Sequence, residues 1–315
     1  WQAEDLKRFK RDANQVRFSS GFHYHIGSDK AFPAEPNRYV LYFNWTCPWS
    51  HRATVTRQLK GLEDVIDIVL LEPSMGKEGW WFGETDAYHD PALGATHLHE
   101  LYSASDSAFT GRVSVPILWD TKTRQIVNND SGAIARMFND EFNELAKYPE
   151  VDFYPAHLRA EIDPVNEFIA KNLNDGVYRC LLAPNQAEYE RAFDTLFESL
   201  DELEHRLSQQ RYLLGDKPTE PDWRAFACLS RFDMIYYSLY KCNLKRIVDY
   251  PNLWEYTRDL YQLPGVASTV KPQEIKRGYY GMIHRGGFVP KGPEIDFLLP
   301  HHRGELAQTS PTEAH

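Results

Sequence analysis

The chain has 315 residues and a formal net charge of −10, with 42% hydrophobic and 25% charged residues. This length favours two domains over a single core. The acidic balance, without a Lys/Arg run longer than two, argues against a nucleic-acid partner and an anionic membrane surface. No apolar run approaches the roughly 20 residues that span a bilayer. The four scattered cysteines indicate a reducing compartment, and we expect the cytoplasm, although a chain that begins at Trp1 leaves an organellar targeting segment open.

The first part of the chain predicts an α/β arrangement. After an irregular arm at residues 1–36, the apolar run RYVLYFN at 38–44 is typical of a strand buried on both faces. A helix that begins at Pro48 follows, and a second buried strand is expected at 65–73. Strand, helix and strand at this spacing indicate a parallel, right-handed βαβ unit.

Residues 73–112 interrupt this order, because the segment is aromatic and too long for a plain connection. We therefore expect a functional segment or an inserted lid. Three further elements follow it: strands at 113–120 and 124–130, and a helix at 131–142 with Ser131 as its N-cap. The resulting βαβ–ββα order predicts a thioredoxin-like domain over residues 37–146.

The second part of the chain predicts an all-helical domain over 158–315, reached through a proline-containing linker at 147–157 and ending in a partly irregular tail. Its helical patterns lie at 158–173, 187–207, 219–240 and 252–262. Thr219 and Asp222 are spaced as an N-cap and an acidic residue three positions later.

The stretch FNWTCPWSHR at 43–52 indicates thiol chemistry. Cys47 lies directly before the helix start, where backbone N–H groups and the positive end of the helix dipole favour a thiolate. Ser50 occupies the place of the second cysteine of a dithiol motif, so a mixed disulfide on Cys47 must be attacked by an outside thiol. A cysteine that only packs in the core is the alternative, which the strand–Cys–Pro–helix context disfavours.

Two other features could contribute to the same site. A cis bond before Pro116 would expose the Val115 backbone to a peptide-like ligand. The helix start at Asp130 and Ser131 could bind a carboxylate, while Asp130 would attract an ammonium group. Taken alone, each is better explained as an edge-strand proline or an ordinary capped turn. The thioredoxin-like order, however, brings both features and Cys47 to one edge of the sheet, where together they describe a glutathione site.

From about residue 20 to 303, the chain resembles the glutathionyl-hydroquinone reductases, also called xi-class glutathione transferases. The similar stretches are NWTCPWSHR, GWWF, GRVSVPILWD, IVNNDSGAIARMFN, NDGVY, TEPDWRAF, RFDMIYYSLYKCN, IKRGYY and VPKGPEIDFLLPHHR. The resemblance implies a thioredoxin-like N-terminal domain followed by an all-helical glutathione-transferase-type C-terminal domain. It also implies a homodimer that holds no permanent cofactor and uses glutathione as a cosubstrate.

The activity that the resemblance implies is removal of glutathione from aromatic hydroquinone conjugates. Cys47 would take the glutathione as a mixed disulfide, and a second glutathione would release it as glutathione disulfide. The implied catalytic residues are Cys47, Tyr178 and Tyr280, and the implied glutathione-binding residues are Trp81, Arg112, Val115, Pro116, Asp130 and Ser131. The implied aromatic-substrate pocket holds Tyr178, Tyr236, Tyr237, Tyr279 and Tyr280, and the choice between Tyr279 and Tyr280 stays open with a preference for Tyr280.

The sequence departs from the family pattern in two places that bear on function. Asp130-Ser131-Gly132 stands where many members have Glu-Ser-Ser, which changes the reach of the acid, and Cys180 with Leu181 follows Tyr178. An omega-like thioltransferase or dehydroascorbate reductase, and a non-catalytic protein that binds aromatic ligands, are alternative functions. The histidine pairs 23/25, 97/99 and 301/302 are interpreted as surface residues, and no metal site is predicted.

Overall fold

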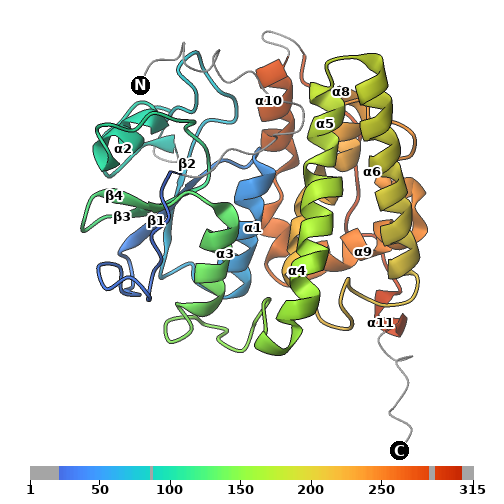
Figure 1. The fold of residues 1–315 in the computed structure, drawn as a ribbon, viewed down its shortest axis with the longest axis horizontal. Coiled ribbons are helices and arrows are strands. Elements are labelled where there is room, and N and C mark those ends of the chain that lie inside the picture. Colours follow the sequence, from blue (N-terminus) through green and yellow to red (C-terminus); the bar gives the residue numbers. More distant parts are fainter. Residues whose placement is uncertain (1–20, 86–87, 284–287, 307–315) are drawn as a thin grey trace, which may run out of the picture. The chain divides into compact units, whose positions relative to one another are not determined.

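The computed structural model describes residues 21–85, 88–283 and 288–306 (Figure 1). Two compact units are formed. Of the described residues, the first unit contains those of 21–152 and 269–290, and the second contains those of 153–268 and 291–306. The segment 269–290 therefore folds with the sheet, whereas the sequence analysis assigned it to the C-terminal helical domain.

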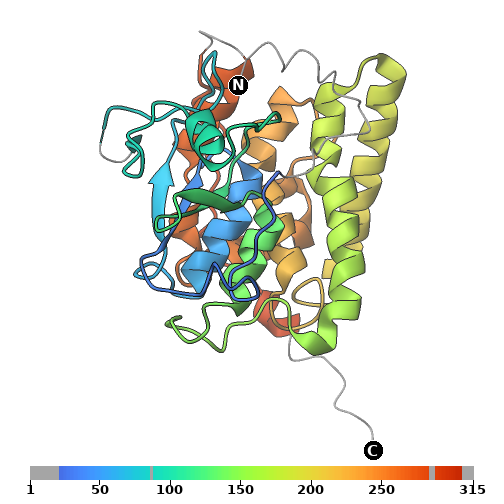
Figure 2. The same cartoon turned by 60° about the vertical axis from the view of Figure 1, so that its left-hand side comes forward.

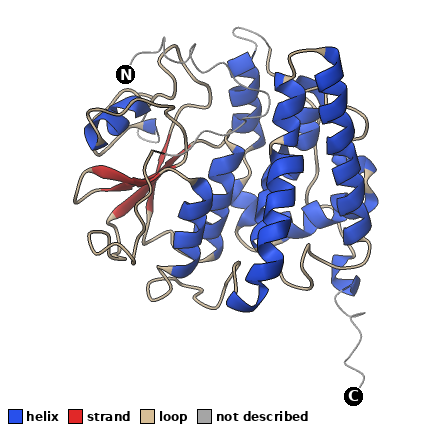
Figure 3. Ribbon diagram, viewed as in Figure 1, coloured by secondary structure: helices blue, strands red, loops and turns tan. Residues whose placement is uncertain are grey.

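The first unit is built on a four-stranded sheet with the order β2-β1-β3-β4. Figure 3 draws the strands in red. Its strands are β1 (Tyr39–Phe43), β2 (Asp67–Leu70), β3 (Ile117–Asp120) and β4 (Gln125–Asn128). β1 pairs in parallel with β2 and antiparallel with β3, and β3 pairs antiparallel with β4. With helices α1 (Pro48–Leu59) and α3 (Ser131–Asp140), this gives the predicted thioredoxin-like βαβ–ββα order.

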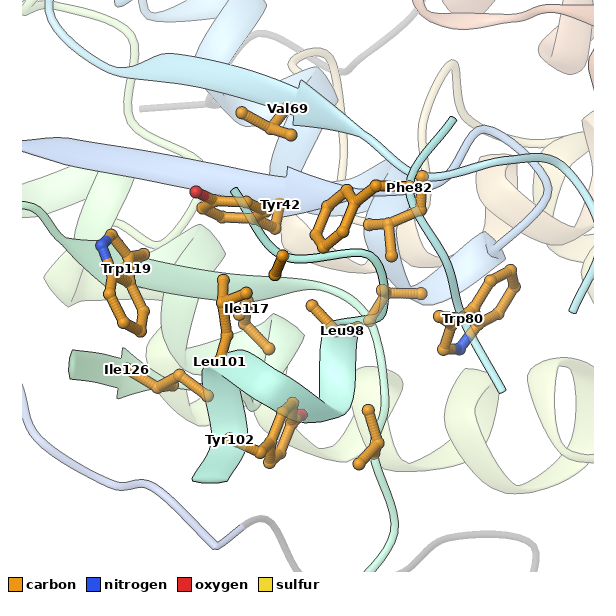
Figure 4. Packing of buried hydrophobic residues seen from close by; sticks show 14 of the residues in the cluster. Tyr42, Val69, Trp80, Phe82, Leu98, Leu101, Tyr102, Ile117, Trp119 and Ile126 are labelled. Atoms are coloured by element: carbon orange, nitrogen blue, oxygen red, sulfur yellow. The ribbon is translucent and has the colours of Figure 1, made fainter. Parts of the chain in front are cut away.

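Successive residues of β1 contribute to two different cores, because side chains alternate across a strand. Leu41 and Phe43 pack with residues of α1 and α3, which lie side by side in Figure 1. Val40 and Tyr42 pack in a second cluster with α2 (Leu98–Ser105), which is drawn in Figure 4. All five residues of β1 are buried, which confirms the predicted two-sided strand.

The described part of the N-terminal arm also joins these cores. Phe22 packs in the cluster that contains α2, and Ile26 and Phe32 pack in the cluster beneath α1 and α3. Residues 1–20 lie outside the described residues. The expected irregular arm at 21–36 is thus irregular in backbone but anchored by apolar side chains.

The insertion at 73–112 contains helix α2, which the sequence pattern did not reveal. A short antiparallel ladder precedes this helix: Leu98 N donates to Trp80 O over 2.9 Å, and Phe82 N donates to Thr96 O over 2.9 Å. Trp81 and His97 are the residues paired between these two hydrogen bonds. The insertion is therefore folded against the sheet through α2.

Helix α10 (Pro272–Ile283) packs against the turn that precedes α1. Thr46 Oγ1 donates to Pro73 O over 3.1 Å and lies 3.3 Å from Glu274 O. A Cβ atom at Gly278 would overlap both Thr46 Oγ1 and the Pro73 carbonyl oxygen. The absence of a side chain at Gly278 thus permits the close packing that joins α10 to the sheet-containing unit.

The second unit is helical. Its elements are η3 (Ala156–Leu158), α4 (Arg159–Phe168), η4 (Ile169–Asn174), α5 (Gly176–Leu182), α6 (Gln186–Leu207), α7 (Glu220–Arg231), η5 (Phe232–Tyr236), α8 (Tyr237–Leu239), η6 (Ile247–Asp249), α9 (Pro251–Gln262) and α11 (Arg303–Leu306). α5 and α6 pack side by side (Figure 2). Thr219 is the N-cap residue of α7 as predicted, and its N–H donates to the side chain of Asp222, three residues later, over 2.7 Å.

Two segments of this unit are π-helical, η4 and η5. Such local widening of a helix is frequent at functional sites. η4 directly precedes the helix that carries Tyr178, and η5 ends at Tyr236. No helix in the described ranges has the length and apolar character needed to cross a membrane.

Candidate active site

Cys47 is the N-cap residue of α1, with an extended backbone at φ −75° and ψ 118°. A hydrogen-bonded turn holds it there: Cys47 N donates to Asn44 O over 3.1 Å, and Asn44 Oδ1 accepts from Thr46 N over 2.7 Å. The amide of Asn44 donates in turn to the carbonyl oxygens of Leu71 and Glu72. The thiol is therefore fixed between the end of β1 and the N–H groups of the first turn of α1, as predicted from the sequence.

The Val115–Pro116 peptide bond is cis, and it lies directly before β3. The Cys47 Sγ atom lies 3.5 Å from the Val115 carbonyl oxygen. The Val115 N–H has no hydrogen-bond partner within the described part of the chain. The structure thus brings Cys47 and the Val115–Pro116 bond together, and it leaves a backbone donor available beside the thiol.

Tyr102 of α2 holds the segment that precedes this bond, and sequence reasoning missed it. Its hydroxyl donates to Ser114 O over 2.8 Å and lies 3.2 Å from Asn129 Nδ2 (Figure 4 shows the side chain). Burial raises the pKa of Tyr102, so the hydroxyl stays protonated. Tyr102 therefore connects the residues before Val115 to those before Asp130.

The helix start at Asp130 and Ser131 differs in detail from the prediction. Asp130, not Ser131, is the N-cap of α3, and its carboxylate accepts from Ala133 N over 2.8 Å. Ser131 is instead the first helical residue. Asp130 is the N-cap because its backbone is extended and its carboxylate accepts from the N–H group three residues later in the helix.

The Ser131 hydroxyl is consequently available to a second residue that sequence reasoning missed, Arg52. Arg52 Nε and Nη2 donate to Ser131 Oγ over 3.1 and 2.7 Å, and the Arg52 residue is only 5% exposed. Arg52 is part of the CPWSHR motif, but an arginine one turn into a helix more often has its charge exposed to solvent. This contact joins α1 to the start of α3.

The other predicted glutathione-binding residues lie in the insertion. Trp81 is partly buried, and its indole N–H donates to Ser74 O over 2.9 Å. Arg112 is partly exposed, and its charge favours the ionised form of the Tyr102 phenol. Both residues therefore lie in the same unit as Cys47.

Tyr279 and Tyr280 are carried by α10, the helix that packs on Thr46. They are 2% and 8% exposed, respectively. They belong to the first unit and lie on an element that contacts the residue next to Cys47.

Within the helical unit, the rings of Tyr178 and Tyr236 are in contact. Their ring centroids lie 6.2 Å apart, and Tyr240 completes the cluster at 5.3 Å from Tyr178 and 5.1 Å from Tyr236. Burial, followed by the neighbouring Tyr178, raises the pKa of Tyr236 well above its ordinary value, so its hydroxyl remains a donor. Tyr237 is partly exposed and makes no ring contact with these three among the described residues.

The four cysteines are free thiols. Cys228 is deeply buried, and burial raises the pKa of its thiol. Cys47 differs from the other three in being the N-cap of a helix. The geometry of the first unit therefore concentrates a helix-terminal thiol, an adjacent backbone donor and a supported serine hydroxyl around one edge of the sheet.

Comparison with known proteins agrees with this geometry. Residues 46–141 match the family model described as glutathione S-transferase, N-terminal domain, and residues 186–259 match glutathione S-transferase, C-terminal domain. The chain is 44% identical over 275 residues to glutathionyl-hydroquinone reductase PcpF of Sphingobium chlorophenolicum, covering 86% of this chain and 87% of that protein. It is 41% identical over 277 residues to glutathionyl-hydroquinone reductase YqjG of Escherichia coli, covering 86% and 84%.

Solved structures give the same result. The glutathione-bound structure of Escherichia coli YqjG superposes with a TM-score of 0.86 at 40% identity, covering 90% of this chain and 96% of that one. A xi-class glutathione transferase from Natrialba magadii gives a TM-score of 0.86 at 40% identity, covering 90% and 89%. The chain is therefore an enzyme that belongs to the glutathionyl-hydroquinone reductase family, the xi class of the glutathione transferases.

Proposed function

We propose that the enzyme uses glutathione to reduce glutathionyl-hydroquinones through a mixed disulfide on Cys47. The observation that carries the proposal is the position of Cys47 at the N-terminus of α1 with Ser50, not cysteine, three residues later. A helix-terminal thiol of this kind is a nucleophile. Without a resolving cysteine in the motif, its mixed disulfide must be opened by a second molecule of thiol.

The reaction balances in two steps. In the first, the Cys47 thiolate forms an S–S bond with the glutathione sulfur as the aryl C–S bond breaks, and the departing ring carbon takes a proton. The hydroquinone product is thereby reduced, and the two sulfurs are oxidised. In the second step, a glutathione thiolate attacks the mixed disulfide, which releases glutathione disulfide and restores the Cys47 thiolate. Two glutathione units are thus consumed in each turnover, one of them from the conjugate.

Glutathione binding is proposed to use the groups around Cys47. The Val115 backbone would pair with the cysteine residue of glutathione as an added strand does. Because Arg52 can only donate, its two N–H groups occupy both lone pairs of Ser131 Oγ and leave the Ser131 O–H to donate to a carboxylate. The N-terminus of α3 supplies further N–H groups, and Asp130 supplies the charge for the γ-glutamyl ammonium. Trp81 and Arg112 are proposed to hold the glycine end, as the resemblance implies.

The tyrosines are proposed to serve the hydroquinone. Tyr280, on the helix that packs against Thr46, is our candidate for donating a proton or a hydrogen bond to the ring. For Tyr178, Tyr236, Tyr237 and Tyr279 the proposed role is recognition of the aromatic ring and its oxygens. Support within the helical unit comes from the ring contacts of Tyr178 with Tyr236 and Tyr240.

A homodimer in the cytoplasm is the proposed physiological form.

The test is turnover of glutathionyl-menadiol with excess glutathione by the parent enzyme and by Cys47→Ser. Release of menadiol together with glutathione disulfide, only when Cys47 is intact, would support the proposal. If the thioether is untouched while a small mixed disulfide is reduced, the enzyme is an omega-like thioltransferase instead. If neither reacts although glutathione or a quinone binds, the proposed thiol chemistry at Cys47 is wrong.

A further inference from the structure

The insertion between β2 and β3 brings together three side chains that the proposed reaction does not use. Glu78 lies in the tight turn between Gly76 and Gly79, His97 is the N-cap residue of α2, and His99 is the second residue of that helix. One ligand atom from each of the three lies within 4.8 Å of the other two. Among the residues that the structure describes, these side chains are therefore close enough together to hold one metal ion. The sequence analysis interpreted His97 and His99 as surface residues because no third ligand lies near them in the sequence.

Hydrogen bonds hold the His97 ring at the start of α2. Glu100 Oε1 accepts from the backbone N–H of His97 over 2.8 Å and from the Thr96 hydroxyl over 3.0 Å. Thr96 Oγ1 in turn lies 2.9 Å from His97 Nδ1. The Thr96 hydroxyl therefore links the Glu100 carboxylate to the His97 ring.

This chain of carboxylate, hydroxyl and imidazole is the kind of support that orients a metal-binding histidine from behind. The other two ligands are also suitably spaced. His99 Nε2 lies 3.4 Å from Glu78 Oε2, close to the about 3.3 Å that separates two ligands in a tetrahedral zinc site with bonds of about 2.0–2.1 Å. The imidazole rings of His97 and His99 are stacked, with centroids 5.4 Å apart and an interplanar angle of 17°.

The three ligands come from both sides of the short ladder that carries Trp81. Trp81 pairs with His97, and the flanking hydrogen bonds join Leu98 N to Trp80 O and Phe82 N to Thr96 O. Glu78 precedes one side of this ladder, and His99 follows the other. An ion held by all three would therefore connect the Gly76–Gly79 turn to the first turn of α2.

We propose that Glu78, His97 and His99 bind one divalent transition-metal ion of the Zn²⁺ type, and that this ion clamps the turn to α2. Two imidazoles and one carboxylate are ligands that Zn²⁺ accepts, and they leave a fourth position for water. The side chains of Glu78 and His99 are 58% and 18% exposed, so an ion can reach the site from solvent. The clamp is distinct from the thiol chemistry at Cys47.

Binding is tested on the untagged full-length chain carrying Cys47→Ser, which removes the thiolate as a competing ligand. Zn²⁺ alone is titrated against a chromophoric chelator, and Co²⁺ absorption reports the coordination. We expect one ion per chain. Glu78→Gln and His99→Ala should each weaken binding by at least tenfold, and Thr96→Val by about tenfold, since loss of a supporting hydrogen bond costs 10–100-fold. His302→Ala is the control, because it removes a histidine that pairs with the carboxylate of Glu255 elsewhere in the chain. It should leave the affinity for Zn²⁺ unchanged.

Equal binding by the parent, Glu78→Gln and His99→Ala would overturn the site, and so would an equal loss in His302→Ala. The clamp has its own test, hydrogen exchange of the Phe82 and Leu98 amides. Zn²⁺ should slow their exchange in the parent and leave it unchanged in Glu78→Gln. Binding of Zn²⁺ by the parent without any slowing would overturn the clamp.

Discussion

The guanidinium group of Arg52 donates two hydrogen bonds to the hydroxyl oxygen of Ser131, over 3.1 and 2.7 Å. This contact connects the helix that begins after Cys47 to the helix whose N-terminus is proposed to bind the γ-glutamyl carboxylate. The two hydrogen bonds from Arg52 use the acceptor lone pairs of the Ser131 hydroxyl oxygen. The Ser131 O–H therefore remains as its one group for a further partner, which it can bind as a donor.

Ser131→Ala is expected to raise the KM for glutathione by about tenfold, the equivalent of one hydrogen bond to a charged group. Arg52→Met should have a similar effect on KM, because it removes the group that orients the hydroxyl. The two losses should be far from additive, since both act through the same hydrogen bond. Steady-state kinetics of the two single variants and the double variant give the KM for glutathione of each, and so measure how far the two effects add. Fully additive effects would contradict the proposed coupling.

Tyr102→Phe removes the hydroxyl that connects Ser114 to Asn129. We expect a loss of about 1–3 kcal/mol in the free energy of unfolding, because the partly buried Ser114 carbonyl and the buried Asn129 amide lose a partner. The KM for glutathione should also rise, since this hydroxyl positions the segment before Val115. Urea unfolding and kinetics check both effects. Tyr24→Phe, at an exposed ring, is the control and should leave both quantities unchanged.

Gly278→Ala places a methyl group against Thr46 Oγ1 and the Pro73 carbonyl oxygen. Because one of these atoms belongs to the backbone, relief requires α10 to move, and overpacking of this kind costs about 1–3 kcal/mol. We expect lower stability and a lower kcat with glutathionyl-menadiol. Gly304→Ala is the matched control, since nothing lies within 4 Å of a Cβ there. An unchanged unfolding midpoint in Gly278→Ala would show that α10 does not pack as described.

The buried ion pair between Arg38 and Asp120 predicts a pH dependence of stability. Arg38 Nε and Nη2 donate to the two carboxylate oxygens over 2.9 and 2.6 Å. Burial raises the pKa of Asp120, but the Arg38 hydrogen bond and others outweigh this and lower the pKa below its ordinary value. The stabilisation is therefore fully present above the unfolded-state pKa of about 3.9, and it is lost as the pH falls through the folded-state pKa.

Asp120→Asn should accordingly cost about 3–5 kcal/mol at pH 7, because it leaves a buried guanidinium without its carboxylate. The difference from the parent should shrink at pH 3. Urea unfolding at both pH values measures it, with Glu188→Gln as the control for an exposed ion pair, for which at most about 1 kcal/mol is expected. A difference that grows toward acid would contradict the assigned direction of the pKa.

Local patterns were sufficient to predict the sheet. The run at 39–43 has only apolar or aromatic side chains, which are buried on both faces of the strand, and Pro48 marks the start of the next helix, so β1 and α1 could be predicted from the sequence. The start of α3 was located correctly, but its N-cap was assigned one residue too late, at Ser131 instead of Asp130.

The contacts between distant residues could not be predicted in this way. Nothing near Gly278 indicates that residue 46 lies against it, so the position of α10 in the first unit was not foreseen. Glu78 is brought to His97 only by the ladder inside the insertion. Arg52 was visible in the motif, but its burial depends on α3, which lies 79 residues further along the chain.

The most direct test of the account is the intact mass of the enzyme after reaction with one equivalent of glutathionyl-menadiol and no free glutathione. We predict that menadiol is released and that one glutathione remains bound to the protein, on the peptide that contains Cys47, until added glutathione removes it. Cys180→Ala should behave like the parent, whereas Cys47→Ser should form no adduct and release no menadiol. Menadiol release by Cys47→Ser, or a glutathione adduct on another cysteine, would contradict the proposed mechanism.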